Sequence, residues 1–179
     1  IYIMDNYKVG GLFSGVGGIE LGFMKSKFDI AWANEFDKYA CKTYRENFKN
    51  HLLIEDDIWN VIDNEFIVNG HPLPPIDILV GGFPCQAFSL AGYRKGFVDP
   101  RGNLFFAILE FIKHFKPKAI MLENVKNLKT HDQGNTFKRI YDELIALDYS
   151  VISRVLNACD YTTIPQNRER IFIVCFKNE

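Results

Sequence analysis

The run Gly81-Gly82-Phe83-Pro84-Cys85-Gln86 places one cysteine directly after an apolar segment and inside a turn. The preceding residues, Ile76 to Val80, are typical of a buried strand, and the glycine pair allows a sharp turn or a close ligand. A thiolate at the end of such a strand can attack an electrophilic carbon. A lone cysteine without further context is more often a small buried side chain. The segment therefore indicates a nucleophile that needs partners elsewhere in the chain.

A second candidate site is the glycine-rich turn Phe13-Ser14-Gly15-Val16-Gly17-Gly18, which follows the apolar segment Val9 to Phe13. Turns between a strand and a helix bind nucleotides through free backbone N–H groups. Glu35 ends the next expected strand, 20 residues after Gly15 (35 − 15), the spacing at which an acidic side chain meets ribose hydroxyls. The third glycine of Gly-x-Gly-x-x-Gly is replaced by Glu20, so a cofactor with adenosine but no pyrophosphate fits better. The alternative is that the glycines only permit a tight turn and close helix packing.

Apolar strands alternate with amphipathic helices along the whole chain, and this order positions both sites. It predicts an α/β fold with a Rossmann-like, doubly wound, mostly parallel sheet that has helices on both faces. We expect strands at 9–13, 30–34, 76–81, 119–123, 150–157 and 170–176. We expect helices at 18–26, 38–48, 104–115 and 136–147. From Asp56 to Pro75 the pattern indicates no clear element.

The overall composition is that of an ordinary globular protein, with 179 residues, 47% hydrophobic and 24% charged. We expect residues 1–179 to form a single domain. No apolar run reaches the ~20 residues of a membrane span and no signal peptide leads the chain, so we expect a cytoplasmic protein without a membrane partner. The four cysteines form no Cys-x-x-Cys pair and the histidines do not cluster, which predicts free thiols and no metal site. A net charge of −1 counts weakly against nucleic acid as a partner.

The motifs taken together resemble those of the cytosine C5-specific DNA methyltransferases, from Lys8 to Phe176. They stand in the order of that family: Phe13-Ser14-Gly15-Val16-Gly17-Gly18, Asn34-Glu35-Phe36-Asp37, Asp57-Ile58, Gly82-Phe83-Pro84-Cys85-Gln86, Glu123-Asn124-Val125 and Gln166-Asn167-Arg168-Glu169-Arg170. The resemblance implies the S-adenosylmethionine-dependent methyltransferase fold, with the last strand antiparallel. It also implies double-stranded DNA as a partner and a bacterial restriction-modification system, with the protein associated with the nucleoid.

For the cofactor, the resemblance implies S-adenosyl-L-methionine, with the glycine turn around the donor, Glu35 on the ribose and Asp57-Ile58 facing the adenine. The implied cofactor-binding residues are Phe13, Gly15, Gly17, Gly18, Glu35, Phe36, Asp57, Ile58, Pro84 and Leu104. One departure is Gly11, where many family members have a polar or acidic residue.

For the reaction, the resemblance implies that Cys85 adds to C6 of a cytosine, because C5 is too weakly nucleophilic to accept a methyl group directly. C5 then attacks the sulfonium methyl group, and loss of the C5 proton expels the cysteine. Glu123 is implied to bind N3 and the exocyclic amine. Arg168 and Arg170 are implied to lie near that carboxylate and the cytosine O2, where a planar guanidinium suits both partners.

The segment from Gln86 to Arg101 is rich in glycine and polar residues and predicts a long loop. A base must leave the duplex before C5 and C6 can react, and such a loop can close over it and exclude water. We expect it to become ordered on binding DNA and cofactor. Its candidate DNA-contacting residues are Gln86, Ser89, Arg94, Lys95 and Arg101.

The resemblance also bears on completeness, because after Phe176 the family continues with a target recognition domain and late motifs. We therefore expect a fragment, or one subunit of a split enzyme whose second chain carries those parts, with weak activity in isolation. Two alternatives stay open: a tRNA cytosine C5 methyltransferase, and a non-catalytic binding or regulatory subunit that keeps the fold. The imperfect glycine pattern disfavours a nicotinamide-dependent Rossmann enzyme.

Overall fold

The computed structural model describes residues 7–83 and 104–178. The chain divides into two compact units, one made of residues 1–81 with 110–118 and the other of residues 82–109 with 119–179. Within a seven-stranded sheet, the strands of the first unit follow the order β3-β2-β1-β6 and those of the second the order β7-β9-β8. Each unit is considered separately below.

The strands of the first unit run parallel and end at the same edge. They are β1 (Lys8–Leu12), β2 (Asp29–Asn34), β3 (Leu53–Ile54) and β6 (Ile78–Gly82). Leu12, at the end of β1, pairs with Asn34 of β2 and Gly81 of β6. The turns that follow β1 and β2 are therefore neighbours, as in other open α/β sheets.

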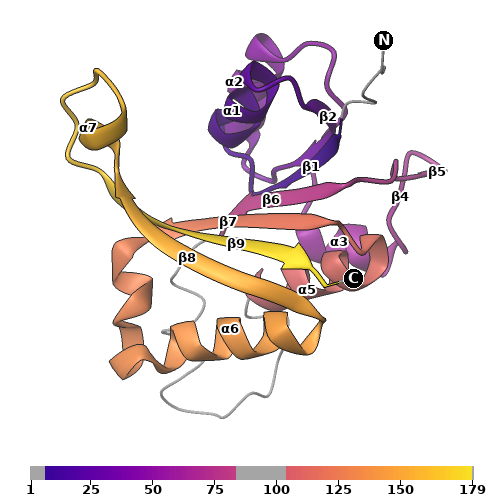
Figure 1. Cartoon of the computed structure of the whole chain (residues 1–179). Helices are drawn as coiled ribbons and strands as arrows, with labels where there is room; N and C mark the ends of the chain where they lie inside the picture. The colour runs from indigo at the N-terminus through magenta and orange to yellow at the C-terminus, as the bar shows by residue number, and fades with distance from the viewer. Residues whose placement is uncertain (1–6, 84–103, 179) are drawn as a thin grey trace, which may run out of the picture. The chain divides into compact units, whose positions relative to one another are not determined.

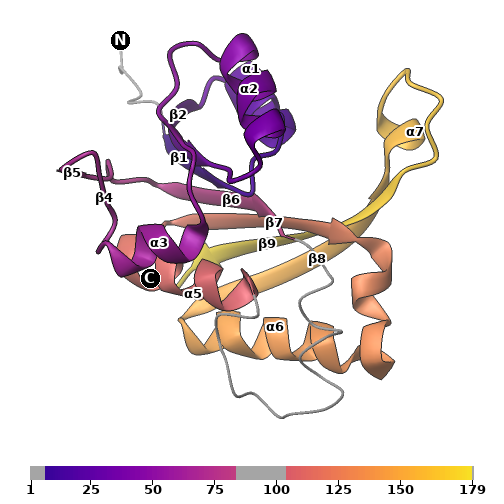
Figure 2. The same ribbon diagram turned by 180° about the vertical axis from the view of Figure 1, so that it is seen from behind.

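Three helices of the first unit begin directly after these strand ends. They are α1 (Gly18–Lys25), α2 (Lys38–Asn47) and α3 (Ile58–Asp63). Aspartates cap two of them: Asp37 accepts hydrogen bonds from the N–H groups of Tyr39 and Ala40, and Asp57 accepts one from Trp59. Figure 1 and Figure 2 show α1 and α2 lying next to each other. A short antiparallel pair, β4 (Ile67–Val68) and β5 (His71–Pro72), precedes β6.

The core of the first unit is built around Trp32 of β2, which is fully buried. Its ring centroid lies 5.8 Å from that of Phe111 and 5.4 Å from that of Phe115, both on α5 (Leu104–Phe115). Its indole N–H donates a hydrogen bond to the carbonyl of Pro74 at 3.0 Å. Trp32 thus joins the central strands to a helix and to the segment before β6.

The second unit contains β7 (Ala119–Val125), β8 (Tyr149–Asn157) and β9 (Glu169–Lys177). β9 runs antiparallel to both neighbours, which confirms the expectation for the last strand. Two 3₁₀ turns, η2 (Lys126–Lys129) and η3 (His131–Gly134), lead into α6 (Asn135–Ala146), which packs on β8. The β8–β9 hairpin carries the short helix α7 (Ala158–Tyr161) at its tip, beyond the end of β7 (Figure 1).

The predicted fold class is confirmed, and every predicted strand and helix is present with bounds that differ by at most two residues. The structure adds β3, α3, β4, β5 and α7, which are too short to show hydrophobic periodicity in the sequence. Cys41 and Cys175 are buried free thiols, whereas Cys159 is exposed on α7 and does not belong to the core. Within residues 7–83 and 104–178, no helix is long and apolar enough to cross a membrane.

Replacing the central tryptophan should destabilise the fold strongly. We expect Trp32→Ala to lower the free energy of unfolding by about 3–5 kcal/mol, because it removes a fully buried aromatic side chain. Ile152→Ala is the control, since Ile152 is 64% exposed on β8, and its effect should stay within about 0.5 kcal/mol. Urea unfolding measures both. An equal loss in the two variants would contradict the role of Trp32.

Candidate active site

The turn after β1 has a backbone that glycine alone adopts easily. Gly15 and Gly17 have φ values of 55° and 90°, in the left-handed region. A Cβ on Gly17 would lie 2.2 Å from Cε2 of Phe48, so this position also lacks room for a side chain. A Cβ on Gly15 or Gly18 would meet no heavy atom within 4 Å. The turn is thus closed on the side of α2 and open at Gly15 and Gly18, where a ligand can approach the backbone.

Glu35 connects this turn to the turn after β2. Its Oε2 accepts a hydrogen bond from the Gly15 N–H at 2.8 Å. Its Oε1 accepts hydrogen bonds from the N–H groups of Phe36 and Asp37, both at 2.9 Å. The sequence did not indicate this contact between residues 15 and 35, and the expected contact of Glu35 with a ribose stays a prediction. The same carboxylate can still accept a hydroxyl, because Oε2 holds a single backbone N–H.

Asn34 holds the third turn of this edge, a role that the sequence did not indicate. Its side chain is buried, and its Nδ2 donates hydrogen bonds to the carbonyls of Ile54 at 3.1 Å and Asp56 at 2.9 Å. These bonds fix the chain just before Asp57, the cap of α3. Its position as the last residue of a strand, next to Glu35, was the signal available in the sequence.

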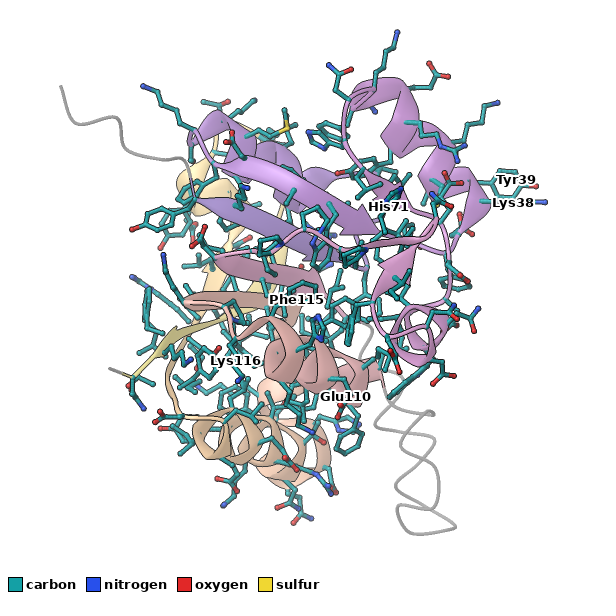
Figure 3. All side chains as sticks on the ribbon, turned by 90° about the vertical axis from the view of Figure 1, so that its right-hand side faces the viewer. Lys38, Tyr39, His71, Glu110, Phe115 and Lys116 are labelled. Carbon is teal, nitrogen blue, oxygen red and sulfur yellow. The ribbon has the colours of Figure 1, made fainter. Side chains whose placement is uncertain are left out.

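The other predicted cofactor residues differ in exposure. Phe36 is 71% exposed on the β2–α2 turn, close in sequence to Lys38 and Tyr39, which project outward from the start of α2 (Figure 3). Ile58 is buried, so its side chain belongs to the core of the first unit. Leu104 is half-buried at the start of α5. Pro84 lies outside the described residues.

In the second unit, Glu123 and Arg170 form an ion pair. Glu123 lies opposite Phe172, and Arg170 lies opposite Val125, so the two side chains are diagonal neighbours on one face of the β7–β9 pair. The Arg170 Nε lies 3.0 Å from the Glu123 Oε1, and the side chains are 24% and 21% exposed, respectively. The guanidinium also donates through Nη1 to the carbonyl of Glu169. A carboxylate and a guanidinium held together in this way can bind the amide-like edge of a planar ring.

Asn124, next to Glu123, fixes the segment that leads to the predicted nucleophile. Its Nδ2 donates a hydrogen bond to the carbonyl of Phe83 at 2.9 Å, and its Oδ1 accepts one from the N–H of Val125 at 2.8 Å. The side chain is 3% exposed. Because Phe83 precedes Pro84 and Cys85, Asn124 ties the strand that carries Glu123 to the start of the cysteine turn. The sequence places Asn124 in the Glu123-Asn124-Val125 motif without assigning it a role.

The two predicted arginines behave differently. The side chain of Arg168 is exposed, and its backbone N–H donates to Oδ1 of Asn157 at 2.8 Å, at the base of the hairpin tip. The structure therefore brings Arg170 to Glu123, while the role of Arg168 stays a prediction. The predicted nucleophile Cys85 and the whole predicted loop lie outside the described residues. This loop includes all the candidate DNA-contacting residues, namely Gln86, Ser89, Arg94, Lys95 and Arg101.

Comparisons with known proteins agree with this pattern of residues. The family model for C-5 cytosine-specific DNA methylase matches residues 7–179. The chain is 53% identical over 173 residues to the Type II methyltransferase M.Bsp6I of Bacillus sp. (strain RFL6), covering 96% of the chain and 52% of that protein. It is 45% identical over 168 residues to the Type II methyltransferase M.HhaI of Haemophilus parahaemolyticus, covering 94% and 48%. The chain thus spans about half the length of these curated relatives.

The fold is also similar to that of solved methyltransferase structures. The structure of Spodoptera frugiperda DNMT2 matches with a TM-score of 0.72 and 23% identity, covering 97% of this chain and 51% of that one. At this identity the match supports the fold alone.

A methyl group at the closed side of the glycine turn should not be tolerated. We expect Gly17→Ala to lower the free energy of unfolding by about 1–3 kcal/mol, through the left-handed φ and the overlap with Phe48. Gly22→Ala is the matched control, because Gly22 is an exposed residue within α1 with open space around it. Gly22→Ala should raise the free energy of unfolding by about 0.5–1 kcal/mol. Thermal unfolding measures both, and equal signs for the two variants would refute this account of Gly17.

Loss of the Asn124 side chain should loosen the attachment of Phe83. We expect Asn124→Ala to cost about 1–3 kcal/mol of unfolding free energy, because it leaves a buried carbonyl without its donor. Asn127→Ala, an exposed position on η2, should change stability by less than about 0.5 kcal/mol. Urea unfolding compares the pair. If Asn124→Ala is as stable as the control, the hydrogen bond to Phe83 does not hold this segment.

Proposed function

This chain belongs to the C-5 cytosine-specific DNA methylase family, and we propose that it transfers a methyl group from S-adenosyl-L-methionine to C5 of a cytosine in double-stranded DNA. The observation that carries the proposal is the second unit's arrangement, in which Glu123 pairs with Arg170 while the adjacent Asn124 holds the residue before Pro84-Cys85. These are the groups that cytosine chemistry needs: a nucleophile and a polar pair for the ring edge. The relatives' names as Type II methyltransferases support a role in restriction-modification.

S-adenosylmethionine fits the residues of the first unit. Gly15 and Gly18 leave open space at the glycine turn, and Glu35 lies at its Gly15 N–H with capacity for a ribose hydroxyl. The exposed ring of Phe36 offers a surface for the adenine. We propose that Phe13, Gly17, Asp57, Ile58, Pro84 and Leu104 complete this site. When bound, the cofactor supplies the electrophilic methyl group that C5 accepts.

The base-binding residues make C5 reactive. The Cys85 thiolate adds to C6, a C–S bond forms, and the electron pair of the C5–C6 double bond becomes available at C5. Glu123 accepts a hydrogen bond from the exocyclic amine and, when it carries a proton, donates one to N3; Arg170 orients Glu123 through the 3.0 Å contact. Arg168 contacts O2. After methylation, a base removes the C5 proton, the C5–C6 double bond reforms, and the C–S bond breaks to release the thiolate.

Binding of DNA requires further groups. We propose that Gln86, Ser89, Arg94, Lys95 and Arg101 contact the duplex around the flipped base. The residues that choose the DNA sequence are proposed to belong to the half of the relatives that this chain does not match, supplied on the same polypeptide or by a second chain.

A covalent adduct tests the proposal directly. The chain is incubated with tritiated S-adenosylmethionine and duplex DNA in which 5-fluorocytosine is incorporated throughout, so that no recognition sequence has to be known. Because fluorine at C5 cannot leave as a proton does, the Cys85–C6 bond should persist. We expect a labelled protein–DNA band on a denaturing gel, and we expect Cys85→Ala to abolish it.

The control is Cys159→Ala, which removes an exposed thiol and should leave the band unchanged. A band that survives in Cys85→Ala would contradict the assignment of the nucleophile. A parallel incubation replaces the DNA with tRNA, and methyl transfer to tRNA in the absence of any DNA adduct would replace DNA as the substrate. Because the chain spans about half of its relatives, both incubations are repeated with the missing half supplied as a second chain, and absence of both products under that condition would refute the catalytic proposal.

A further inference from the structure

Glu20 occupies a place that its residue type does not predict. It lies in the first turn of α1, yet it is 1% exposed. Its carboxyl lies over Gly11 of β1, where an added Cβ would be 2.1 Å from Oε1. The missing side chain at position 11 therefore makes room for the Glu20 carboxyl. The glycine at position 11, which departs from the family pattern, and the burial of Glu20 therefore depend on each other.

The Glu20 carboxyl is only partly satisfied by its neighbours. Among residues 7–83 and 104–178, Oε2 of Glu20 has no hydrogen-bond partner, while the hydroxyl of Ser14, itself 8% exposed, interacts with the same carboxyl and lowers its pKa. Both atoms lie close to Gly11, since an added Cβ there would be 2.9 Å from the Ser14 Oγ. A buried polar group without a partner costs free energy, so its presence beside the glycine turn needs a functional explanation.

The electrostatic surroundings of Glu20 favour a cation. Burial raises the pKa of the Glu20 carboxyl, hydrogen bonds from the Ser14 hydroxyl and from its own backbone N–H lower it, and the negative charge of Glu35 raises it, with a net rise. Tyr44 of α2 faces the same carboxyl: burial raises the pKa of Tyr44 and the charge of Glu20 adds to this effect. The hydroxyl of Tyr44 is hydrogen-bonded to His51 at 2.9 Å. In the described part of the chain, no positively charged group contributes to the pKa of Glu20.

We propose that the Glu20 carboxylate recognises the positive charge of the methyl donor and so makes the glycine turn prefer S-adenosylmethionine over S-adenosylhomocysteine. The two ligands differ by one methyl group and by the charge on sulfur, which the product has lost. A sulfonium above the turn offsets the repulsion between Glu20 and Glu35, whereas a neutral thioether does not. Glu20 acts through the field beneath the turn and touches no reacting atom, so it is a specificity-determining residue. The inference rests on the proposed cofactor.

Glu20→Gln separates the charge of this side chain from its shape. In calorimetric titrations of the whole chain, we expect the variant to bind S-adenosylmethionine about three- to tenfold more weakly, the size of a screened interaction between buried and partly buried charges. S-adenosylhomocysteine and 5′-methylthioadenosine, which carry no sulfonium, should lose less than about twofold by the same reasoning. Glu46→Gln is the matched control, because it removes an exposed carboxylate from α2 and should leave all three affinities unchanged.

The pH dependence of binding tests the inference without any variant. A raised pKa means that Glu20 gains its charge only above the ordinary carboxyl range. The preference for S-adenosylmethionine over S-adenosylhomocysteine should therefore increase as pH rises through that raised pKa, and Glu20→Gln should remove the increase. An unchanged preference in Glu20→Gln, or a flat pH profile in the unmodified chain, overturns the role of Glu20 while leaving the cofactor in place. If the unmodified chain binds none of the three nucleosides, the cofactor proposal fails and this inference fails with it.

Discussion

The carboxylate of Glu35 is the interaction on which the first unit depends. It accepts hydrogen bonds from the N–H groups of Gly15, Phe36 and Asp37, and so it holds the turns after two neighbouring strands in one arrangement. These N–H groups lie at the ends of parallel strands, where the sheet offers them no acceptor. With the turns fixed, α1 and α2 start in defined directions, and Phe48, the residue that follows α2, can pack against Gly17. The open side of the glycine turn follows from this arrangement.

Strand direction has the same importance in the second unit. Because β9 is antiparallel to β7, Arg170 near the beginning of β9 lies beside Glu123 near the end of β7. In a parallel pair the beginnings of the strands would meet, and the ion pair could not form. The reversal also places the β8–β9 hairpin tip beyond the strand end that carries Glu123 (Figure 2). A local change of topology therefore brings charged side chains from distant parts of the sequence to one edge.

Sequence patterns predicted the long elements well because hydrophobic periodicity is a local property. The helix at 104–115 has the predicted bounds, and the strand that ends just before Glu35 and the strand that carries Glu123 were both predicted. The two-residue strand β3 is too short for any period, and α3 begins at an aspartate cap that the pattern alone did not reveal. The choice between Arg168 and Arg170 as the partner of Glu123 depends on the register of β7 with β9. No spacing within the sequence could determine it.

The buried polar residues to which the sequence analysis assigned no role divide into two kinds. Asn34 and Asn124 lie at or near the ends of their strands. Their side-chain amides donate hydrogen bonds to carbonyls that are 20 and 41 residues away in the sequence, so both have partners within the protein. An amide suits this role, because it has both a donor and an acceptor and can complete hydrogen bonding where strands give way to loops.

Glu20 is different, because it is as buried as the two asparagines and yet its Oε2 has no partner among the described residues. A polar side chain that serves only the fold gains its stability from the partners it has. The two asparagines meet that condition and therefore explain how the turns are held. Glu20, beside Ser14 and Gly11, meets it only in part. The physical distinction between satisfied and unsatisfied buried groups thus separates the residues that build this edge of the sheet from those directed at a ligand.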